Sequence, residues 1–426
     1  MVKVSVIIPV YGTEKWVGEC LDSVLSQTLK EIEVICIDDA SPDRCPEILD
    51  DYATRDSRVK VIHFPQNHLQ GYGRNRGTET ASGKYIYYLD SDDFIVPGTL
   101  KELYEAAEAD DLDGIFFDSS VSYENEELGA EFSGYETGRN CVYEDRVYSG
   151  AELFEAFVEN DDWNVYVQRQ FWKKSFLQSS GAFFPEGVIH EDEFFSHAAI
   201  LAAERVRYIN KAYFVRRFRE DSATTGKIPK RDFKGYFRSL CEMLRLAELR
   251  RDMGLETTMA EKNNILHLYE LSLISYSEGS GIESPDGWVA DETDLEVFNI
   301  FKYISRYDDY YAAKNAPIWR KIDGFDHIYV YGAGKLARAA IRRINLANHK
   351  VEKVIVKSKA GNPGSLMGIE VIALQDVDIP ESTAIVAALS EKYHREVSEA
   401  LKNKGAVYFL YAHAKLSGPF GLERVK

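Results

Sequence analysis

Residues 85–93 have the sequence Tyr-Ile-Tyr-Tyr-Leu-Asp-Ser-Asp-Asp, in which a short apolar run ends directly in three carboxylates. An apolar run of this length, rich in aromatic residues, is typical of a buried β-strand. Three ionised carboxylates so close together repel one another unless a cation or hydrogen-bond donors offset their charge. Carboxylate oxygens are natural ligands of Mg²⁺ and Mn²⁺, which often share coordination with substrate phosphates. The alternative is a solvated acidic turn before a helix near Pro97, and these residues alone favour neither interpretation.

Strand and helix patterns alternate on both sides of this stretch. We expect strands at residues 4–10, 33–37, 59–64, 85–89 and 113–118, and helices at 14–28, 71–82 and 97–109. A further helix is expected to open at Ser41-Pro42, with Ser41 as its cap. Such alternation predicts a parallel α/β sheet, whose ligands bind beyond the carboxyl ends of its strands. Asp38-Asp39 and the acidic run Asp90–Asp93 therefore belong to the same edge of the predicted sheet.

Length and composition limit the class of protein. The 426 residues exceed one ordinary core, so we expect two or three domains. A net charge of −18 argues against nucleic-acid binding, which needs a basic surface. No apolar run approaches the ~20 residues of a membrane span, and the N-terminus begins directly as a strand, which favours a cytoplasmic protein. The five cysteines have no metal-site spacing and are expected to be free thiols.

Three further groups have chemistry suited to a site, although each is weak alone. An acid such as Asp39 can accept a hydrogen bond from the imide of uracil, and Arg74 could bind base carbonyl or phosphate oxygens. Glu191 and Asp192 stand just before an expected helix, where a carboxylate could act as a general base. Acids in a first helical turn are also favoured simply by the helix dipole, and these residues alone favour that structural role.

Five stretches, in this order, resemble family 2 glycosyltransferases. They are Val-Ser-Val-Ile-Ile-Pro-Val-Tyr at 4–11, Leu-Asp-Ser-Val-Leu-Ser-Gln-Thr at 21–28, Ile-Asp-Asp-Ala-Ser at 37–41, Gly-Arg-Asn-Arg-Gly at 73–77 and Leu-Asp-Ser-Asp-Asp at 89–93. The resemblance covers roughly residues 1–225. It implies a GT-A fold, an inverting reaction, a UDP-sugar donor and a Mn²⁺ or Mg²⁺ cofactor. The family's usual alanine before the Arg-Asn pair is Gly73 here, a small change that leaves the assignment intact.

The resemblance also implies roles for individual residues. The predicted nucleotide-binding residues are Pro9, Tyr11, Asp39, Arg74 and Asp90, and the predicted metal ligands are Asp92 and Asp90, with Asp92 the more direct.

Residues 191–195 are similar to the family's Glu-Asp-x-x-Phe motif. The similarity makes Asp192 the expected base and Glu191 its orienting neighbour, although the opposite assignment stays open. Residues 217–222 are similar to an Arg-x-Arg-x-x-Ser segment, so Arg217, Arg219 and Ser222 are expected to bind the diphosphate; a solvated basic turn is the alternative. Trp163 and Tyr166 could stack on an acceptor sugar or pack in the core.

The later half of the chain changes character twice. We expect a GT-A catalytic domain at residues 1–228, a helical subdomain at 229–323 and a small Rossmann-like α/β domain at 324–426. Gly332-Ala333-Gly334 follows a strand and fits a dinucleotide-binding turn. However, the strand at 353–356 ends in Lys357-Ser358-Lys359, where an NAD-binding domain would place an acid. A structural, oligomerising or acceptor-positioning role is therefore favoured over nucleotide binding.

The sequence thus predicts an inverting glycosyltransferase that moves a sugar from a nucleotide donor, by resemblance UDP-linked, to an acceptor hydroxyl. A saccharide or lipid-linked saccharide acceptor, bacterial polysaccharide or glycoconjugate synthesis, and peripheral association with the inner membrane face are hypotheses from the resemblance. A sugar-nucleotidyltransferase would need a glycine-rich basic loop after the first strand, and residues 11–16 hold one glycine and an acid. A non-catalytic nucleotide-sensing module is the other alternative.

Overall fold

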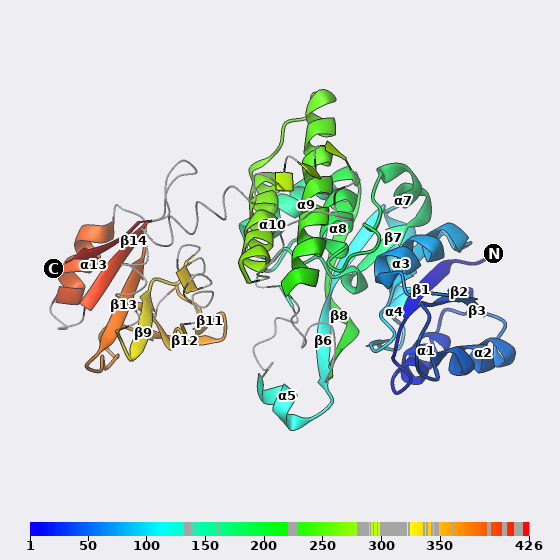
Figure 1. Cartoon of the computed structure of the whole chain (residues 1–426), viewed down its shortest axis with the longest axis horizontal. Coiled ribbons are helices and arrows are strands. Elements are labelled where there is room, and N and C mark those ends of the chain that lie inside the picture. The colour runs from blue at the N-terminus through cyan, green and yellow to red at the C-terminus, as the bar shows by residue number, and fades with distance from the viewer. Residues whose placement is uncertain are drawn as a thin grey trace. The chain divides into compact units, whose positions relative to one another are not determined.

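The chain forms two compact units, residues 1–302 and 303–426, each built around its own sheet (Figure 1). This computed structural model describes residues 1–131, 138–139, 141–160, 162–219, 229–278, 289, 291–292, 294–295, 297–298, 322, 324–334, 337, 340–341, 344, 349–359, 361–389, 393–402, 407–412 and 421–425. Within these residues, each helix is too short or too polar to span a bilayer. The boundaries of the three expected domains stay a prediction.

The first unit contains an eight-stranded sheet with the order β3-β2-β1-β4-β7-β6-β8-β5. Its strands are β1 (Val4–Val10), β2 (Ile32–Asp38), β3 (Val59–His63), β4 (Tyr85–Tyr88), β5 (Phe94–Ile95), β6 (Gly114–Tyr123), β7 (Gln170–Lys173) and β8 (Val206–Phe218). Strands β3, β2, β1 and β4 run parallel, whereas β7 is antiparallel to both of its neighbours. The parallel half confirms the expected α/β class and brings the ends of β1, β2 and β4 to one edge.

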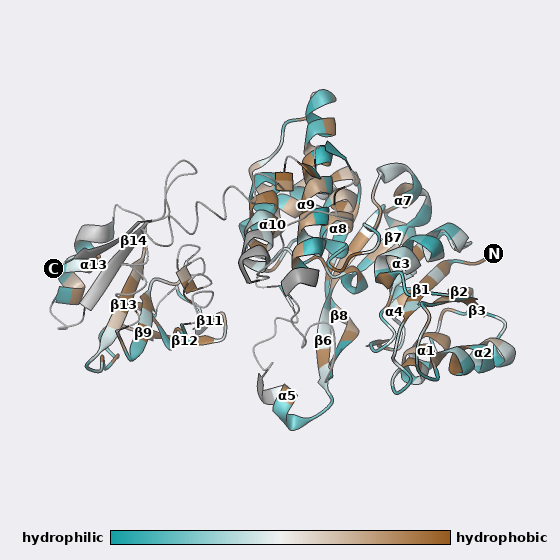
Figure 2. Ribbon diagram, viewed as in Figure 1, coloured by the Kyte–Doolittle hydropathy of each residue, from teal (hydrophilic) through white to brown (hydrophobic). Residues whose placement is uncertain are grey.

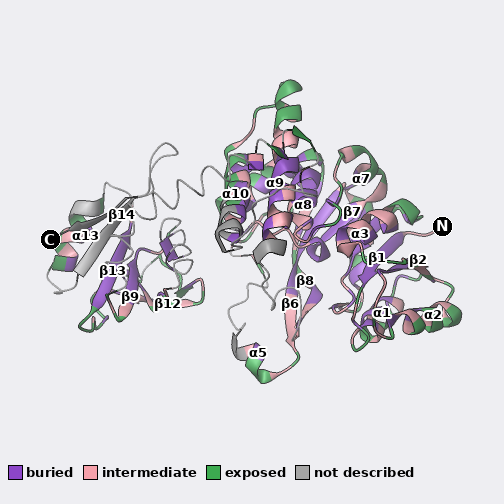
Figure 3. Cartoon of the chain, viewed as in Figure 1, coloured by how far each residue is buried: buried purple, intermediate pink, exposed green. Residues whose placement is uncertain are grey.

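Helices follow most of these strands. The first unit contains α1 (Val17–Leu25), α2 (Cys45–Arg55), α3 (Leu69–Thr80), α4 (Thr99–Ala109), α5 (Glu126–Glu131), α6 (Gly150–Glu159), η1 (Val167–Arg169), α7 (Lys174–Ser180), α8 (Asp192–Ala202), α9 (Pro229–Asp252) and α10 (Met259–Glu278). Apolar residues are concentrated on the strands, and α2 turns a largely hydrophilic surface outward (Figure 2). Figure 3 shows the same contrast in burial: the strands of the sheet are mostly buried, whereas the outer surface of α2 is exposed.

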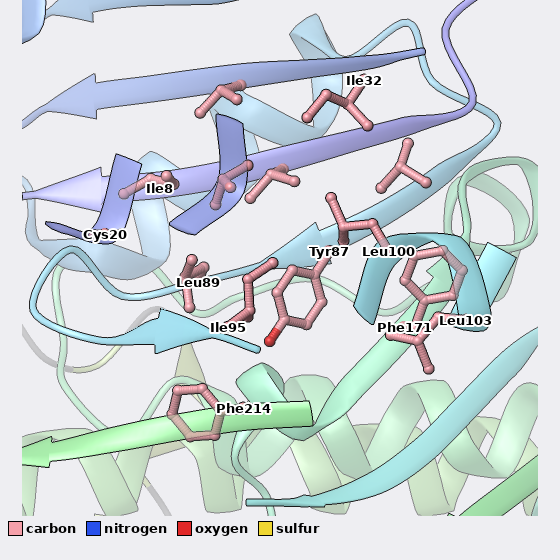
Figure 4. Packing of buried hydrophobic residues seen from close by; sticks show 14 of the residues in the cluster. Ile8, Cys20, Ile32, Tyr87, Leu89, Ile95, Leu100, Leu103, Phe171 and Phe214 are labelled. Carbon is pink, nitrogen blue, oxygen red and sulfur yellow. The ribbon is translucent and has the colours of Figure 1, made fainter. Parts of the chain in front are cut away.

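Strand β1 is buried along its whole length because apolar cores lie on both of its faces. Ile8 belongs to the core that also contains Cys20 of α1 and Leu100 of α4, drawn in Figure 4. Ile7 points to the opposite core, which includes Phe195 of α8. The continuous apolar run at residues 4–10 is therefore the pattern of a strand covered on both faces.

Helix α3 packs very closely on this sheet because it carries glycines where it crosses the strands. A Cβ atom on Gly77 would clash with Ile7 of β1, and one on Gly73 would lie 3.3 Å from Cγ2 of Ile37 in β2. The close approach brings the Arg74 side chain down to the carboxyl edge of the sheet.

The second unit has a seven-stranded sheet with the order β11-β12-β10-β9-β13-β14-β15. Its elements are β9 (His327–Tyr331), β10 (Lys353–Val356), β11 (Ser365–Leu366), β12 (Ile369–Ala373), β13 (Thr383–Ala388), α13 (His394–Lys402), β14 (Val407–Ala412) and β15 (Gly421–Val425). The five central strands run parallel. Gly332 follows β9 with a φ of 118°, a conformation that needs glycine. A dinucleotide-binding role for this unit stays a prediction.

Some of the expected element boundaries are wrong, and the helix expected at residues 14–28 is the shorter α1. Helix α2 begins at Cys45 rather than at Ser41-Pro42, because Ala40 has a φ of 59° and Asp38 accepts a hydrogen bond from the backbone of Ser41, which closes a turn there. The strand expected at residues 113–118 runs further, because residues 119–123 continue β6 beside β8.

Candidate active site

The acidic turn after β4 is held by protein partners rather than left in solvent. Ser91 accepts a hydrogen bond of 2.9 Å from Thr13, which ties the turn to the loop after β1. The Asp90 carboxylate accepts a 2.7 Å hydrogen bond from Nη2 of Arg74 on one oxygen and a hydrogen bond from the Gln168 amide on the other. A simple solvated turn does not describe this geometry.

Negative charge accumulates at this turn. Burial, together with repulsion from Asp90, raises the pKa of Asp92, and the nearby Arg219 only partly opposes the shift. Burial and repulsion from Asp92 raise the pKa of Asp93 well above its usual range. Such shifts mark carboxylates whose ionised forms lack full compensation. A divalent cation fits this donor set, since both oxygen ligands and excess negative charge are present.

Three or more acidic, histidine or cysteine side chains do not gather into a metal-holding group anywhere in the described part of the chain. A cation bound by Asp92 and Asp90 would therefore have to complete its coordination with other oxygens. Mg²⁺ commonly does this with waters and substrate phosphates.

Two arginines from the end of β8 converge on the same turn. The backbone N–H of Arg217 donates to Oδ1 of Asp93 at 2.7 Å, and its Nε donates to the carbonyl of Asp92 at 2.9 Å. Arg219 donates from Nε to Oδ2 of Asp92 and lies over the ring of Trp16. Both guanidinium groups are mostly covered, with 13% of each side chain exposed, so they do not form a solvated basic turn. Ser222 lies outside the described residues.

The two candidate base residues lie at the start of α8. Glu191 is completely buried and accepts a hydrogen bond from Nη1 of Arg74. Asp192 is only half-buried. Burial and the neighbouring Glu191 raise the pKa of Asp192 to about 7, against the opposing effect of Arg74. The structure therefore distinguishes an inner carboxylate bound to arginine from an outer one that titrates near neutral pH.

Arg74 joins the two acidic groups. Its side chain is buried, with one Nη bound to Asp90 and the other to Glu191. Burial opposes the charge on this guanidinium, but Asp90 and Glu191 outweigh it and raise the Arg74 pKa. Residues from three distant parts of the sequence thus form one connected ionic network at the carboxyl edge of the sheet.

Comparison with known proteins identifies the family of residues 5–162. Residues 5–162 match the family model described as glycosyl transferase family 2. The first unit contains a family 2 glycosyltransferase domain. The expected α/β fold class is confirmed by the sheet, and a GT-A first unit is what the family match implies. Glu191 and Asp192 come after the matched residues, so their assignment rests on the local motif and the geometry.

Individual relatives are similar over part of their length. The uncharacterized glycosyltransferase EpsJ of Bacillus subtilis is 33% identical over 53% of this chain and 63% of its own. The GalNAc(5)-diNAcBac-PP-undecaprenol beta-1,3-glucosyltransferase of Campylobacter jejuni is 29% identical over 55% of this chain and 72% of its own. The chain therefore spans about three fifths of the first of these relatives. Among solved structures, residues 1–349 of S. aureus TarS in complex with UDP-GlcNAc match with a TM-score of 0.49 and 22% identity, over 64% and 81% of the two chains.

The residues expected to bind the nucleotide base are only partly brought together in this glycosyltransferase domain. Pro9 lies near the end of β1 beside Ile37 of β2, and Asp39 follows β2. The Asp39 carboxylate is buried and accepts a 2.8 Å hydrogen bond from the backbone N–H of His68. Tyr11 is half-exposed in the loop after β1. Arg74, by contrast, contacts Asp90 of the acidic turn and Glu191.

Sequence reasoning missed several residues that contribute to the site. Gln168 gave no signal, because a single glutamine before a strand is common, yet its amide binds Asp90. His190 has a φ of 60°, stacks on Tyr236 of α9 at 3.9 Å between ring centroids, and accepts at its carbonyl from Ser239. Helix α9 thus supports the turn that precedes the carboxylate pair, a role that no pattern in α9 indicated.

The two aromatic candidates differ in their surroundings. Trp163 packs edge-on against Phe154 at 4.8 Å within a hydrophobic core, so core packing explains it. Tyr166 lies under the guanidinium of Arg216 at 4.7 Å from the ring centroid.

Proposed function

We propose that this chain transfers a sugar from a nucleotide-sugar, specifically a UDP-sugar, to the hydroxyl group of an acceptor with inversion at the anomeric carbon. One observation carries the proposal: Arg74 connects the acidic turn to the carboxylate pair 117 residues further along the chain. A donor site and a base must lie side by side for a single displacement, and the contacts of Arg74 with Asp90 and Glu191 support that proposed arrangement. The family 2 match supports the same reaction class.

The donor diphosphate is proposed to lie between the acidic turn and the end of β8. Asp92 and Asp90 would hold Mn²⁺ or Mg²⁺, which supplies positive charge to the leaving diphosphate when bound. Arg217 and Arg219 already lie at this turn, so their guanidinium groups can bind phosphate oxygens beside the carboxylates. Asp39, Pro9 and Tyr11 remain the proposed contacts of the base, because they border the same edge.

Asp192 is the proposed general base. A base with a pKa near the operating pH is the most effective, and the pKa of Asp192 is raised to about 7. Glu191 is the weaker candidate, because it is completely buried and already bound to Arg74. In the displacement, Asp192 takes the proton of the acceptor hydroxyl. At the same time the hydroxyl oxygen of the acceptor forms the new bond to the anomeric carbon. The bond to the diphosphate breaks at the same time, and UDP leaves.

The acceptor is proposed to be a saccharide, either free or carried on a lipid diphosphate. The name of the Campylobacter jejuni relative describes an acceptor linked to undecaprenol through a diphosphate, which supports this class. A lipid-linked acceptor would bring the protein to a membrane surface, and peripheral association is part of the proposal.

The test is release of UDP from a panel of UDP-sugars with Mn²⁺, first with water as acceptor and then with added saccharides. The wild-type chain should release UDP from at least one donor, and EDTA should stop the release. Asp192→Asn should lower turnover roughly 10²–10⁴-fold while leaving UDP affinity unchanged. Asp51→Asn, on the exposed face of α2, is the control. Full activity of the Asp192→Asn variant, or no binding of any uridine nucleotide, would refute the proposal.

A further inference from the structure

Helix α3 makes a second set of contacts, separate from its packing on the sheet, with the segment at residues 184–191. Asn75 forms a two-sided pair with the backbone of Phe184. Its Nδ2 donates to the carbonyl of Phe184 at 2.8 Å, and its Oδ1 accepts from the N–H of Phe184 at 3.0 Å. A side-chain amide that satisfies both backbone groups of one residue acts as a strand partner does, and it fixes the start of this segment.

Gly71 allows the same segment to lie directly against the helix. A Cβ atom at this position would lie 2.8 Å from the carbonyl oxygen of Pro185 and 2.9 Å from Cγ of Glu191. Neither neighbour has room to move, since one is backbone and Glu191 is completely buried. Glycine is therefore required by the close approach of α3 to the carboxylate and not by its own φ angle.

Arg74 completes this contact face at its buried end. Its guanidinium binds Glu191 and Asp90 and lies over the Phe184 ring, at 5.4 Å from the centroid. The same ring stacks on Phe195 of α8, with 4.0 Å between centroids. The beginning and the end of the segment are thus both bound to one face of α3, and α8 is attached to it.

We propose that the face of α3 formed by Gly71, Arg74 and Asn75 positions the Glu191–Asp192 pair against the acidic turn. In this role Arg74 and Asn75 are positioning residues, and Arg74 does not read the nucleotide base. The proposal rests on the proposed function for the identity of the reaction, but the contacts that carry it are independent of any nucleotide. It explains why an arginine of this helix is buried among carboxylates instead of facing the edge near Asp39.

The first experiment separates positioning from nucleotide binding. Arg74→Lys keeps the positive charge but cannot bind both carboxylates in the same fork geometry. We expect its kcat for sugar transfer or donor hydrolysis to fall roughly 100-fold, which is the loss that follows a small misplacement of reacting groups. The Kd for UDP, measured with Mn²⁺ present, should be unchanged. Asn75→Ala should also lower kcat and leave that Kd unchanged. Glu79→Gln, on the exposed side of α3, is the matched control and should behave as wild type.

A rise in the UDP Kd that accounts for the whole loss of activity in Arg74→Lys would overturn the proposal, since it would make Arg74 a nucleotide contact. Wild-type kcat in both Arg74→Lys and Asn75→Ala would overturn it as well.

A second measurement needs no substrate, so it separates failure of this proposal from failure of the proposed function. Hydrogen exchange of the full-length protein should show faster exchange at residues 184–191 in Asn75→Ala and Arg74→Lys. Residues 17–25 of α1 should be unchanged, and Glu79→Gln should match wild type throughout. Wild-type protection of residues 184–191 in both variants would refute the positioning role even if the chain proves to be an active transferase. If no nucleotide-sugar is used, faster exchange there still supports the positioning role.

Discussion

Arg219 donates from Nε to Oδ2 of Asp92 across 2.7 Å, and this bond fixes the end of β8 on the turn after β4. The guanidinium also lies 4.5 Å from the ring centroid of Trp16, which belongs to the loop after β1. One side chain therefore connects three elements at the proposed diphosphate position. A diphosphate that enters between them meets a cationic group already oriented by aromatic and carboxylate contacts.

Replacing Arg219 should weaken nucleotide binding. Arg219→Gln removes one charge-assisted hydrogen bond worth about 1.5–3 kcal/mol, so the Kd for UDP with Mn²⁺ should rise by roughly tenfold or more. Isothermal titration calorimetry measures this directly. Arg251→Gln, an exposed position on α9, is the control for loss of one positive charge. Equal UDP affinity in wild type and Arg219→Gln would contradict the assignment of Arg219 to the diphosphate.

The rate should depend on pH through Asp192. Because its pKa is raised to about 7, the carboxylate is protonated below that pH and cannot accept the proton of the acceptor hydroxyl. We expect kcat/KM to level off above pH 7 and to fall about tenfold per pH unit below it. The residual rate of Asp192→Asn should lack this dependence. A wild-type kcat/KM that stays constant below pH 7 would show that a different group acts as the base.

Asp118 should be important for stability, although it lies outside the proposed chemistry. This buried carboxylate binds Nη1 of Arg139 at 3.0 Å, Nη2 of Arg169 at 2.7 Å and the hydroxyl of Tyr208 at 2.5 Å. Asp118→Ala would leave two buried guanidinium groups without their shared counter-charge, so unfolding should cost about 3–5 kcal/mol less. Urea unfolding followed by tryptophan fluorescence tests this.

The control for Asp118 is Glu31→Ala, which removes an exposed pair with Lys3 and should scarcely move the unfolding midpoint. Similar midpoints for Asp118→Ala and Glu31→Ala would show that the buried arginines find other partners.

Two glycines offer a matched comparison of packing. A Cβ atom on Gly150, the first residue of α6, would clash with the carbonyl oxygen of Ile200 and lie 2.9 Å from that of Ala203. Gly150→Ala should therefore destabilise the fold by about 1–3 kcal/mol. Gly18→Ala in α1 meets its nearest atom at 3.6 Å and should be neutral or stabilising by up to about 1 kcal/mol. The thermal unfolding midpoint should fall in Gly150→Ala and stay the same or rise in Gly18→Ala. Equal falls of the midpoint in the two variants would contradict the steric explanation.

Local patterns in the sequence were sufficient for the parallel part of the sheet. The expected strand at residues 4–10 coincides with β1. The others differ by one residue at one end from β3 and β4, and by one residue at each end from β2. Doubly buried strands leave continuous apolar runs, and such runs are visible without an alignment. The start of α2 was predicted wrongly because a turn closed by the Asp38 side chain competes with a Ser-Pro helix start.

The sequence was sufficient to predict which residues belong to the candidate site, but not which of these residues bind one another. Motif order pointed to Asp90, Arg74 and Glu191, yet it did not predict that Arg74 binds both carboxylates. That arrangement depends on how deeply α3 packs on β1 and on the path of the segment before Glu191. Both are tertiary properties. Gln168 and His190 could not be found for the same reason, since their roles arise only from their neighbours in space.

The sheet order also has a consequence for how the protein is made. Strand β7 lies between β4 and β6, and β8 lies on the other side of β6, so both neighbours of β6 are encoded after it. A nascent chain that has left the ribosome only as far as residue 162 therefore carries β6 with two unpaired edges. Such edges readily associate with other chains. Synthesis through the end of β8 at Phe218 is what gives β6 its second neighbour, and it also delivers Arg217 to Asp92 and Asp93 of the acidic turn.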